Sequence, residues 1–172
     1  MPLVESFDPV IGVNPKVLIL GSMPGVKSLQ VQQYYAHPRN AFWPIMSALF
    51  DIDWAVDYDT RIEQFKALPL ALWDVLGACH REGSLDADIS QEQLQVNPID
   101  RLLQEHLGIS LIVFNGATAE RFFRQKAAES ISNLHRYSLL KLPSTSPAHA
   151  SRTLQQKLDE WQAIGKYLNN IG

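Results

Sequence analysis

"KVLILGSMPG", residues 16–25, places a short apolar run directly before glycine, serine and proline. A second run of this kind, "SLIVFNG" at 110–116, also ends in glycine. Short continuous apolar runs that stop at glycine are typical of parallel strands buried on both faces of a sheet. The runs "ALPLALWDVLG" at 67–77 and "YSLLKLP" at 137–143 resemble them more weakly and bring the candidate strands to four.

Helical patterns lie between these runs. Residues 41–50 are predicted to be helical after Asn40, and residues 117–128 are predicted to be helical after the third strand. "NPIDRLLQEH" opens with Asn97 as an expected N-cap and Pro98 at the first helical position. Strands that alternate with helices imply a parallel sheet covered on both sides, connected by right-handed crossovers.

The last helix has the clearest apolar stripe, with spacings of four and three residues. Its members are Leu154, Leu158, Trp161, Ile164 and Leu168. A stripe of this kind is expected to pack against the sheet. The chain has 172 residues, of which 46% are apolar, which suits one well-packed domain over residues 1–172.

The cysteine content and the N-terminus bear on the cellular compartment. Cys79 is the single cysteine of the sequence, which rules out an internal disulfide framework, and no cysteine pair or close histidine pair has zinc-site spacing. "MPLVESFDPVIG" lacks the basic and apolar regions of a signal peptide, and no apolar run approaches the ~20 residues that span a bilayer. We therefore expect a soluble, cytoplasmic protein that uses no metal and no membrane.

The net charge is −3 and the pI is about 5.9, which argues against indiscriminate binding to nucleic acid. The charges are not spread evenly, because acidic residues crowd into 51–63. A local cationic face remains possible from basic residues expected in loops or at loop edges: His37, Arg39, His80, Arg81, His149 and Arg152.

Ligands of parallel α/β sheets bind beyond the carboxyl ends of the strands. The segments to consider are therefore 21–25, 74–84, 115–116 and 144–149. "GSMPG" lacks the lysine and the serine or threonine of a P-loop, and no G-x-G-x-x-G follows a strand. No G-x-S-x-G elbow supports a hydrolytic triad.

Five segments taken together carry a family resemblance: "LILGSMPG", "YYAHPRNAFW", "LWDV", "IVFNG" and "LPSTSPAHA". In this order, over roughly residues 15–165, they resemble the uracil-DNA glycosylase superfamily, most closely its hypoxanthine-DNA (deoxyinosine) glycosylase branch. The resemblance implies a doubly wound α/β/α domain with a four-stranded parallel sheet. It also implies a monofunctional enzyme of base excision repair, which needs no cofactor and hydrolyses the N-glycosidic bond of a deaminated base flipped out of DNA.

The resemblance also suggests where catalysis occurs. Gly21, Ser22 and Met23 match the first motif, which forms part of the base pocket. Mismatch-specific uracil glycosylases have an asparagine at the place of Met23 that positions the attacking water, whereas a thioether is a weak acceptor. In the hypoxanthine branch an asparagine of the second segment is implicated, and its match here is Asn40. Asn40 can equally be the N-cap of the following helix, or serve both roles.

Three further residues are expected at the base pocket. Tyr35 matches a ring that stacks on the flipped base, with a core tyrosine as the alternative, whereas Tyr34, Phe42 and Trp43 are expected to pack. Asp74 falls where superfamily members contact the base edge, and a carboxylate would suit the N1 donor of hypoxanthine. Asp74 can instead cap a turn or pair with Arg81. Asn115 has a similar pocket-edge position, although "NG" is also a common turn signal.

"STSPAHA" at 144–150 resembles the motif that presses on the minor groove and holds the base out. Its serines can donate hydrogen bonds to phosphate, and His149 can contact a phosphate or the leaving base, or simply face solvent. Ala148 and Ala150 flank His149, so no bulky wedge is evident there. The residues expected to contact DNA are Arg39, Arg81, Ser144, Ser146, Pro147, His149 and Arg152, with Lys27 as a further phosphate candidate.

Two alternatives remain beside the excision of hypoxanthine. The first is a uracil glycosylase, including one that acts on mismatches. The second is a catalytically weak module that binds lesions, which Met23 keeps open. In each case the expected partner is DNA that contains a deaminated base, bound by a monomer.

Overall fold

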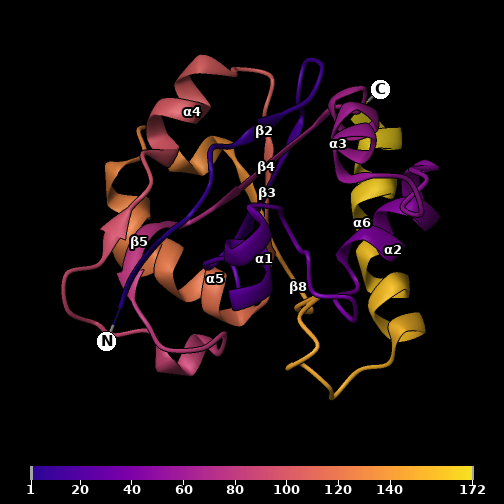
Figure 1. The fold of residues 1–172 in the computed structure, drawn as a ribbon. Coiled ribbons are helices and arrows are strands. Elements are labelled where there is room, and N and C mark those ends of the chain that lie inside the picture. The colour runs from indigo at the N-terminus through magenta and orange to yellow at the C-terminus, as the bar shows by residue number, and fades with distance from the viewer. Residues whose placement is uncertain (1, 172) are drawn as a thin grey trace.

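The computed structural model describes residues 2–171, and its centre is a five-stranded sheet in the order β2-β4-β3-β7-β8 (Figure 1). Four strands are parallel: β3 (Val17–Gly21), β4 (Leu70–Asp74), β7 (Leu111–Asn115) and β8 (Ser138–Leu142). The fifth, β2 (Val10–Ile11), is a short antiparallel strand at the edge. The predicted four-stranded parallel sheet is confirmed, with this edge strand added.

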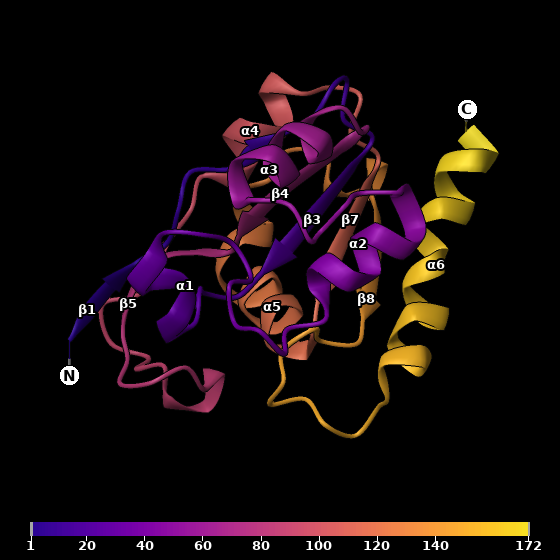
Figure 2. The same cartoon turned by 45° about the vertical axis from the view of Figure 1, so that its right-hand side comes forward.

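Alternate residues of β3 enter two separate cores. Val17 and Ile19 pack on the side of α2, α3 and α6, whereas Leu18 and Leu20 pack on the side of α4 and α5. Both faces of the sheet are therefore covered, which gives the expected doubly wound α/β/α layers (Figures 1 and 2). The helices are α1 (Val26–Val31), α2 (Phe42–Phe50), α3 (Tyr58–Lys66), α4 (Ile99–Glu105), α5 (Ala117–Phe122) and α6 (Leu154–Ile171).

A second, antiparallel sheet was not expected from the sequence. It has the order β1-β5-β6, with β1 (Leu3–Glu5), β5 (Leu76–His80) and β6 (Gln95–Val96). Residues 74–84 were predicted to form a loop after a strand. This prediction is wrong for residues 76–80, which form β5 and end at His80. The apolar run of β4 continues past Val75 into β5, whose partners are distant in the sequence.

Asn97 serves a different purpose from the predicted N-cap. Helix α4 begins at Ile99 with Pro98 in the cap position, and no side chain caps it. The Asn97 Nδ2 instead donates to the carbonyl oxygens of Asp74 at 2.8 Å and Leu76 at 3.3 Å. Asn97 therefore satisfies backbone acceptors where β4 passes into β5, a position that only the tertiary structure defines.

Helix α6 buries most of the predicted stripe. Trp161 and Ile164 are fully buried, and the Trp161 Nε1 donates to the carbonyl oxygen of Pro143 at 2.9 Å. Leu154 is the exception at 54% exposure, because the first turn extends beyond the sheet. A buried lysine, Lys157, lies in the same half of the helix.

The aromatic residues after α1 anchor the loop that leads into α2. Trp43 is buried, its Nε1 donates to the carbonyl oxygen of Tyr34 at 3.0 Å, and its ring meets Phe42 edge-on at 5.0 Å. Tyr34 is also buried, and its Oη donates to the carbonyl oxygen of Asp8 at 2.8 Å. The predicted packing roles of Tyr34, Phe42 and Trp43 are thereby confirmed.

Replacement of the buried anchor should destabilise the whole fold. Trp43→Ala is expected to lower the free energy of unfolding by ~3–5 kcal/mol, because the loss of a large ring leaves a cavity. Urea denaturation of Trp43→Ala and of Trp54→Ala, whose indole is about half exposed, measures the difference. Equal effects of the two substitutions would show that Trp43 is not an anchor.

Candidate functional site

A cavity of about 610 Å³ opens at the carboxyl edge of the parallel strands. Gly21 is paired with Asp74, and Asn115 with Leu142, so the ends of neighbouring strands lie level at this edge. The chain runs from β3 to β4 on one side and returns past β3 to β7 on the other, which is the switch point where such sheets bind ligands. The cavity is lined by residues of the segments 21–28, 34–40, 84–86, 115–118 and 144–149.

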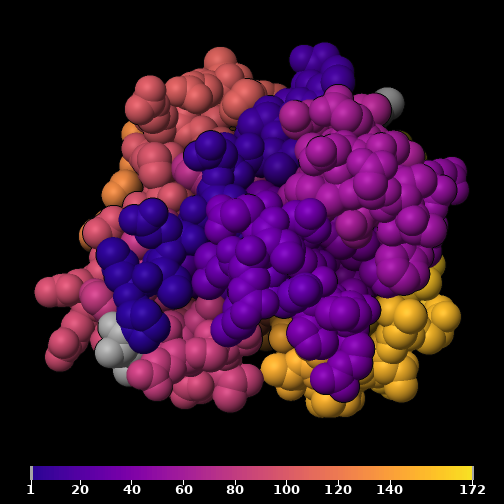
Figure 3. Space-filling model, viewed as in Figure 1, coloured from indigo at the N-terminus to yellow at the C-terminus, as the bar shows by residue number. Residues whose placement is uncertain are grey.

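The cavity lies at the lower end of the molecule as drawn. The loop after β5 and the loop before α6 both reach this end, beside α1 (Figures 1 and 2). In the space-filling view they form the pink and yellow parts of the lower edge (Figure 3). The structure thus brings together the four segments that the sequence analysis placed beyond the strand ends.

Gly21 allows two functional groups to approach the end of β3. A Cβ at this position would lie 2.5 Å from Asp74 Oδ1 and 3.0 Å from Tyr35 Oη. Any side chain at residue 21 would therefore displace the carboxyl or the phenol. These two groups and the end of β3 form the floor of the cavity.

Asp74 is a buried carboxyl at the end of β4. Its Oδ2 has no hydrogen-bond partner within residues 2–171, and no ion pair joins it to Arg81. Burial, followed by the charge of Asp86, raises the pKa of Asp74 to about 7, whereas Arg81 acts in the opposite direction. Asp74 therefore changes protonation state close to neutral pH.

Arg81 corrects one of the predicted DNA contacts. Its side chain is only 1% exposed, and its Nη2 donates to the carbonyl oxygen of Pro24. The Nε and Nη1 atoms have no partner in the described part of the chain. A guanidinium buried behind the 21–25 loop cannot reach a phosphate, so Arg81 supports that loop instead.

Asp86 was missed by the sequence analysis and lines the same cavity. Its Oδ1 accepts from the Ser22 hydroxyl at 2.8 Å, and its carboxyl also bonds to the Thr118 side chain. Burial raises the pKa of Asp86, and these two hydrogen bonds oppose the rise. "SLDADIS" holds no pattern that distinguishes Asp86 from a solvent-exposed acid, so only the tertiary structure identifies it.

Asn115 joins three segments around the cavity. Its Nδ2 donates to Tyr35 Oη at 3.2 Å and to Thr145 Oγ1 at 3.0 Å, while its Oδ1 accepts from the Thr145 backbone N–H at 2.9 Å. The following Gly116 has a φ of +95°, and a Cβ there would lie 2.9 Å from the Cβ of Ser144. "NG" therefore does form a turn, and the Asn115 side chain also fixes the neighbouring loops.

Asn40 lies one residue before the N-cap position of helix α2, which Ala41 occupies. Its Oδ1 accepts from the backbone N–H of Phe42, the first residue of the helix, at 2.9 Å, so the side chain satisfies one free N–H at the helix start without being the predicted N-cap residue. Asn40 is half-buried and lines the cavity. Within the described residues, its Nδ2 and the second lone pair of its Oδ1 have no partner, so the carboxamide retains hydrogen-bonding capacity.

Tyr35 lies between the core and the cavity. Its φ of 54° is in the left-handed region, which is uncommon for a tyrosine and is held here by the surrounding contacts. One face of its ring stacks on Phe42, with centroids 4.1 Å apart and planes at 24°. Phe42 is thereby covered and does not line the cavity, whereas Tyr35 lines it together with Tyr34 and His37. Met23 is buried among apolar residues.

The 144–149 loop is held by its own hydroxyl oxygens. Ser144 Oγ accepts from the Ser146 backbone N–H at 3.1 Å, and Ser146 Oγ accepts from the Ala148 backbone N–H at 3.2 Å. A serine hydroxyl that accepts in this way still has its proton available to donate. Pro147 lies within the second of these turns and lines the cavity.

A buried lysine supports the same loop from α6. The Lys157 Nζ donates to the carbonyl oxygen of Ser146 at 3.3 Å, and that oxygen also accepts from the His149 backbone N–H at 3.0 Å. Burial, followed by the charges of Lys157 and Arg152, lowers the pKa of His149. This direction favours the neutral imidazole, and its Nε2 lies 3.4 Å from Ser151 Oγ.

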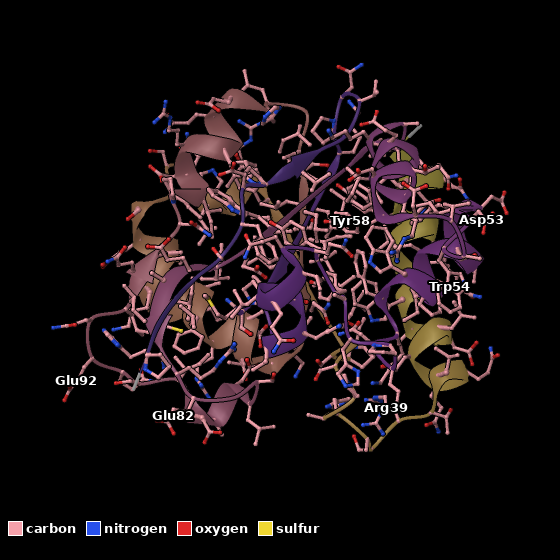
Figure 4. The ribbon with its side chains drawn as sticks, in the orientation of Figure 1. Arg39, Asp53, Trp54, Tyr58, Glu82 and Glu92 are labelled. Carbon is pink, nitrogen blue, oxygen red and sulfur yellow. The ribbon has the colours of Figure 1, made fainter. Side chains whose placement is uncertain are left out.

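The remaining predicted cations differ in their availability. Arg39 is exposed at the lower edge of the molecule, beside the cavity (Figure 4). Lys27 is also exposed and lines the cavity. Arg152 Nη1 lies 2.9 Å from Glu160 Oε2, so its charge is partly neutralised.

No cluster of three or more His, Cys, Asp or Glu side chains within residues 2–171 could hold a metal ion. No helix in that part of the chain is long and apolar enough to cross a membrane.

The doubly wound sheet and its cavity define a class of protein. The family model of the uracil DNA glycosylase superfamily matches residues 9–168, and the chain belongs to this superfamily. The resemblance of its five sequence segments is confirmed by this match.

Individual relatives refine the comparison. The chain is 34% identical over 158 residues to a hypoxanthine DNA glycosylase of Methanosarcina barkeri, covering 91% of this chain and 94% of that protein. It is 32% identical over 164 residues to a hypoxanthine DNA glycosylase of Methanosarcina acetivorans, covering 95% and 98%. The solution NMR structure of a uracil DNA glycosylase candidate from M. acetivorans matches with a TM-score of 0.78 and 30% identity, covering 98% and 99%.

The raised pKa of Asp74 should make stability depend on pH. Between about pH 4 and about pH 7, the folded protein retains a proton on Asp74 that the unfolded chain has lost. The free energy of unfolding should therefore fall as the pH rises through this window, by about 1.4 kcal/mol per unit from this group. Asp74→Asn should flatten the dependence in chemical denaturation from pH 4 to pH 8. An unchanged slope in the variant would assign the dependence to other groups.

Proposed function

We propose that the single domain of residues 1–172 is a monofunctional DNA glycosylase that releases hypoxanthine from deoxyinosine and leaves an abasic site. Its substrate is DNA that contains a deaminated base, and it acts as a monomer in base excision repair. The observation that carries the proposal is the cavity floor, where the Asp74 carboxyl, whose Oδ2 has no partner among the described residues, and the Tyr35 hydroxyl both lie close to Gly21. Relatives named hypoxanthine DNA glycosylase, similar over nearly their whole length, support the choice of base.

Recognition of the flipped base rests on one stacking ring and one carboxyl group. A base that has left the duplex is held by stacking and by hydrogen bonds to its edge. Tyr35 supplies the ring and continues the stack that begins with Phe42, with ~1–3 kcal/mol expected from one base. Hypoxanthine offers an N1–H donor and an O6 acceptor, so ionised Asp74 accepts from N1 while protonated Asp74 donates to O6.

Hydrolysis requires a water molecule placed against C1′ of the deoxyribose. The bond from C1′ to N9 breaks with its electron pair going to the base, and water adds to the sugar cation and loses a proton. Asn40 can orient this water through the free lone pair of its Oδ1, while the other lone pair accepts from the first backbone N–H of α2. Met23 offers no comparable acceptor.

Contacts to the DNA backbone come from the rim of the cavity. Arg39 and Lys27 supply positive charge, and the hydroxyl protons of Ser144 and Ser146 can donate to phosphate oxygens. Neutral His149 can donate its single ring N–H to a phosphate oxygen. Arg152 contributes less, because Glu160 shares its charge.

Uracil is the second candidate base, because its N3–H would also suit the Asp74 carboxyl. Duplexes that carry single inosine, uracil or xanthine lesions, treated with the protein and then with alkali, distinguish these substrates. Inosine is expected to be cleaved fastest. Tight binding without cleavage of any lesion would indicate a lesion-binding module instead.

Catalysis should depend on the Asn40 carboxamide. Asn40→Ala is expected to lower single-turnover excision of hypoxanthine by on the order of a hundredfold or more, and to cost ~1 kcal/mol of stability as the cap is lost. Asn40→Ser keeps a capping oxygen and separates the two effects. If Asn40→Ala loses stability in thermal melts but excises at the wild-type rate, Asn40 is a cap alone.

Binding to DNA should weaken as salt is added, despite the net charge of −3, because the rim of the cavity is locally basic. Arg39→Ala is expected to reduce the slope of log affinity against log salt by about 1. Arg101→Ala is the matched control, since Arg101 lies on α4 and pairs with Glu105. Equal slopes for Arg39→Ala and the wild type would remove Arg39 from the DNA contact.

A further inference from the structure

The loop 144–149 carries no long aliphatic side chain. It consists of small or polar residues, one proline and one histidine. When a nucleotide leaves the duplex, its place in the stack must be filled or the base returns. Glycosylases and other proteins that distort DNA commonly use an apolar wedge for this.

The rim of the cavity holds two exposed, large apolar side chains within the described residues. Leu85 is 52% exposed and Val26 is 37% exposed, and both line the cavity. Val26 belongs to the first turn of α1, and its side chain is short and branched at Cβ. Leu85 lies in the loop after β5 and is both longer and more exposed.

The neighbours of Leu85 fix its orientation. Ser84 Oγ accepts from the Val26 backbone N–H at 2.7 Å, and Asp86 Oδ1 accepts from the Ser22 hydroxyl at 2.8 Å. The backbone of Leu85 is extended, with φ −77° and ψ 131°. Successive side chains of extended backbone point in opposite directions, so two inward anchors turn the leucine between them outward.

The position of Leu85 distinguishes it from an ordinary exposed leucine, which by itself means little. Its loop lies at the same lower edge of the molecule as Arg39, and Glu82 marks this loop in Figure 4. The 144–149 loop bounds the same cavity from the other side. Leu85 is therefore one of the residues, with Arg39 and the 144–149 loop, that surround a nucleotide bound in this cavity.

We infer that Leu85 is the wedge that enters the base stack where the flipped nucleotide has left it. The inference rests on the proposed function, and it assigns the wedge to the loop after β5 instead of the 144–149 loop. On insertion, the leucine side chain leaves water and contacts the apolar faces of the flanking bases. This burial stabilises the flipped state and slows the return of the base.

A comparison of duplex with single-stranded substrate tests the wedge. Leu85→Ala should lower single-turnover excision from an inosine duplex by on the order of ten- to a hundredfold. Excision from single-stranded inosine DNA should be unchanged, because no stack has to be held open. Leu85→Met should retain most of the duplex rate, and Leu107→Ala, an exposed leucine that does not line the cavity, should match the wild type. Thermal melts show whether each variant is folded.

Two results would overturn the wedge. The first is that Leu85→Ala excises hypoxanthine from the duplex at the wild-type rate. The second is that the excision rate falls equally on duplex and single-stranded DNA, which would place Leu85 in the base pocket. If the wild type excises no base from any substrate, the proposed function fails independently. Binding to a duplex with a stable abasic-site analogue and an adjacent 2-aminopurine then tests insertion directly, and equal fluorescence for the wild type and Leu85→Ala would exclude it.

Discussion

The hydrogen bonds between Asn115 and Thr145 are the constraint on which the cavity depends. Asn115 ends β7, and its carboxamide engages both the backbone and the hydroxyl of Thr145, while Thr145 accepts from the backbone N–H of Ala41. One buried pair thus fixes the 144–149 loop and the entry to α2 against the edge of the sheet. Because Asn115 also reaches Tyr35, the stacking ring and the loop beside it are held by the same side chain.

Charge is distributed by depth in this cavity. Two carboxyls lie inside, Asp74 on the floor and Asp86 against Ser22, with Arg81 buried behind the loop that they face. The free cations, Arg39 and Lys27, lie at the rim. An acidic interior repels a phosphate and can accept from a base, whereas a basic rim attracts the phosphate. A negative net charge is therefore compatible with a face that binds DNA.

The parts that could be predicted from the sequence are those set by local pattern. Three of the four parallel strands, β3, β4 and β7, are short apolar runs that end at Gly21, Asp74 and Asn115, and Asn40 bonds to the first backbone N–H of the helix that follows it. Strand β5 was not predicted, because the apolar run of β4 continues into it without a break. Its pairing partners, β1 and β6, are distant in the sequence. Arg81 and Asp86 were likewise not predictable, since their burial depends on a loop packed against the first motif.

Close packing constrains the first half of the 144–149 loop, at Ser144 and Thr145. A Cβ added to Gly116 would clash with the Cβ of Ser144. Thr145 is buried between Asn115 and Ala41. A loop clamped this tightly suits small residues that bring backbone and hydroxyl groups to a phosphate. In the loop after β5, Ser84 and Asp86 are anchored on either side of one exposed leucine. That loop therefore has room for a large exposed side chain. On this view the 144–149 loop holds the DNA backbone beside the flipped base, and the loop after β5 fills the gap in the base stack.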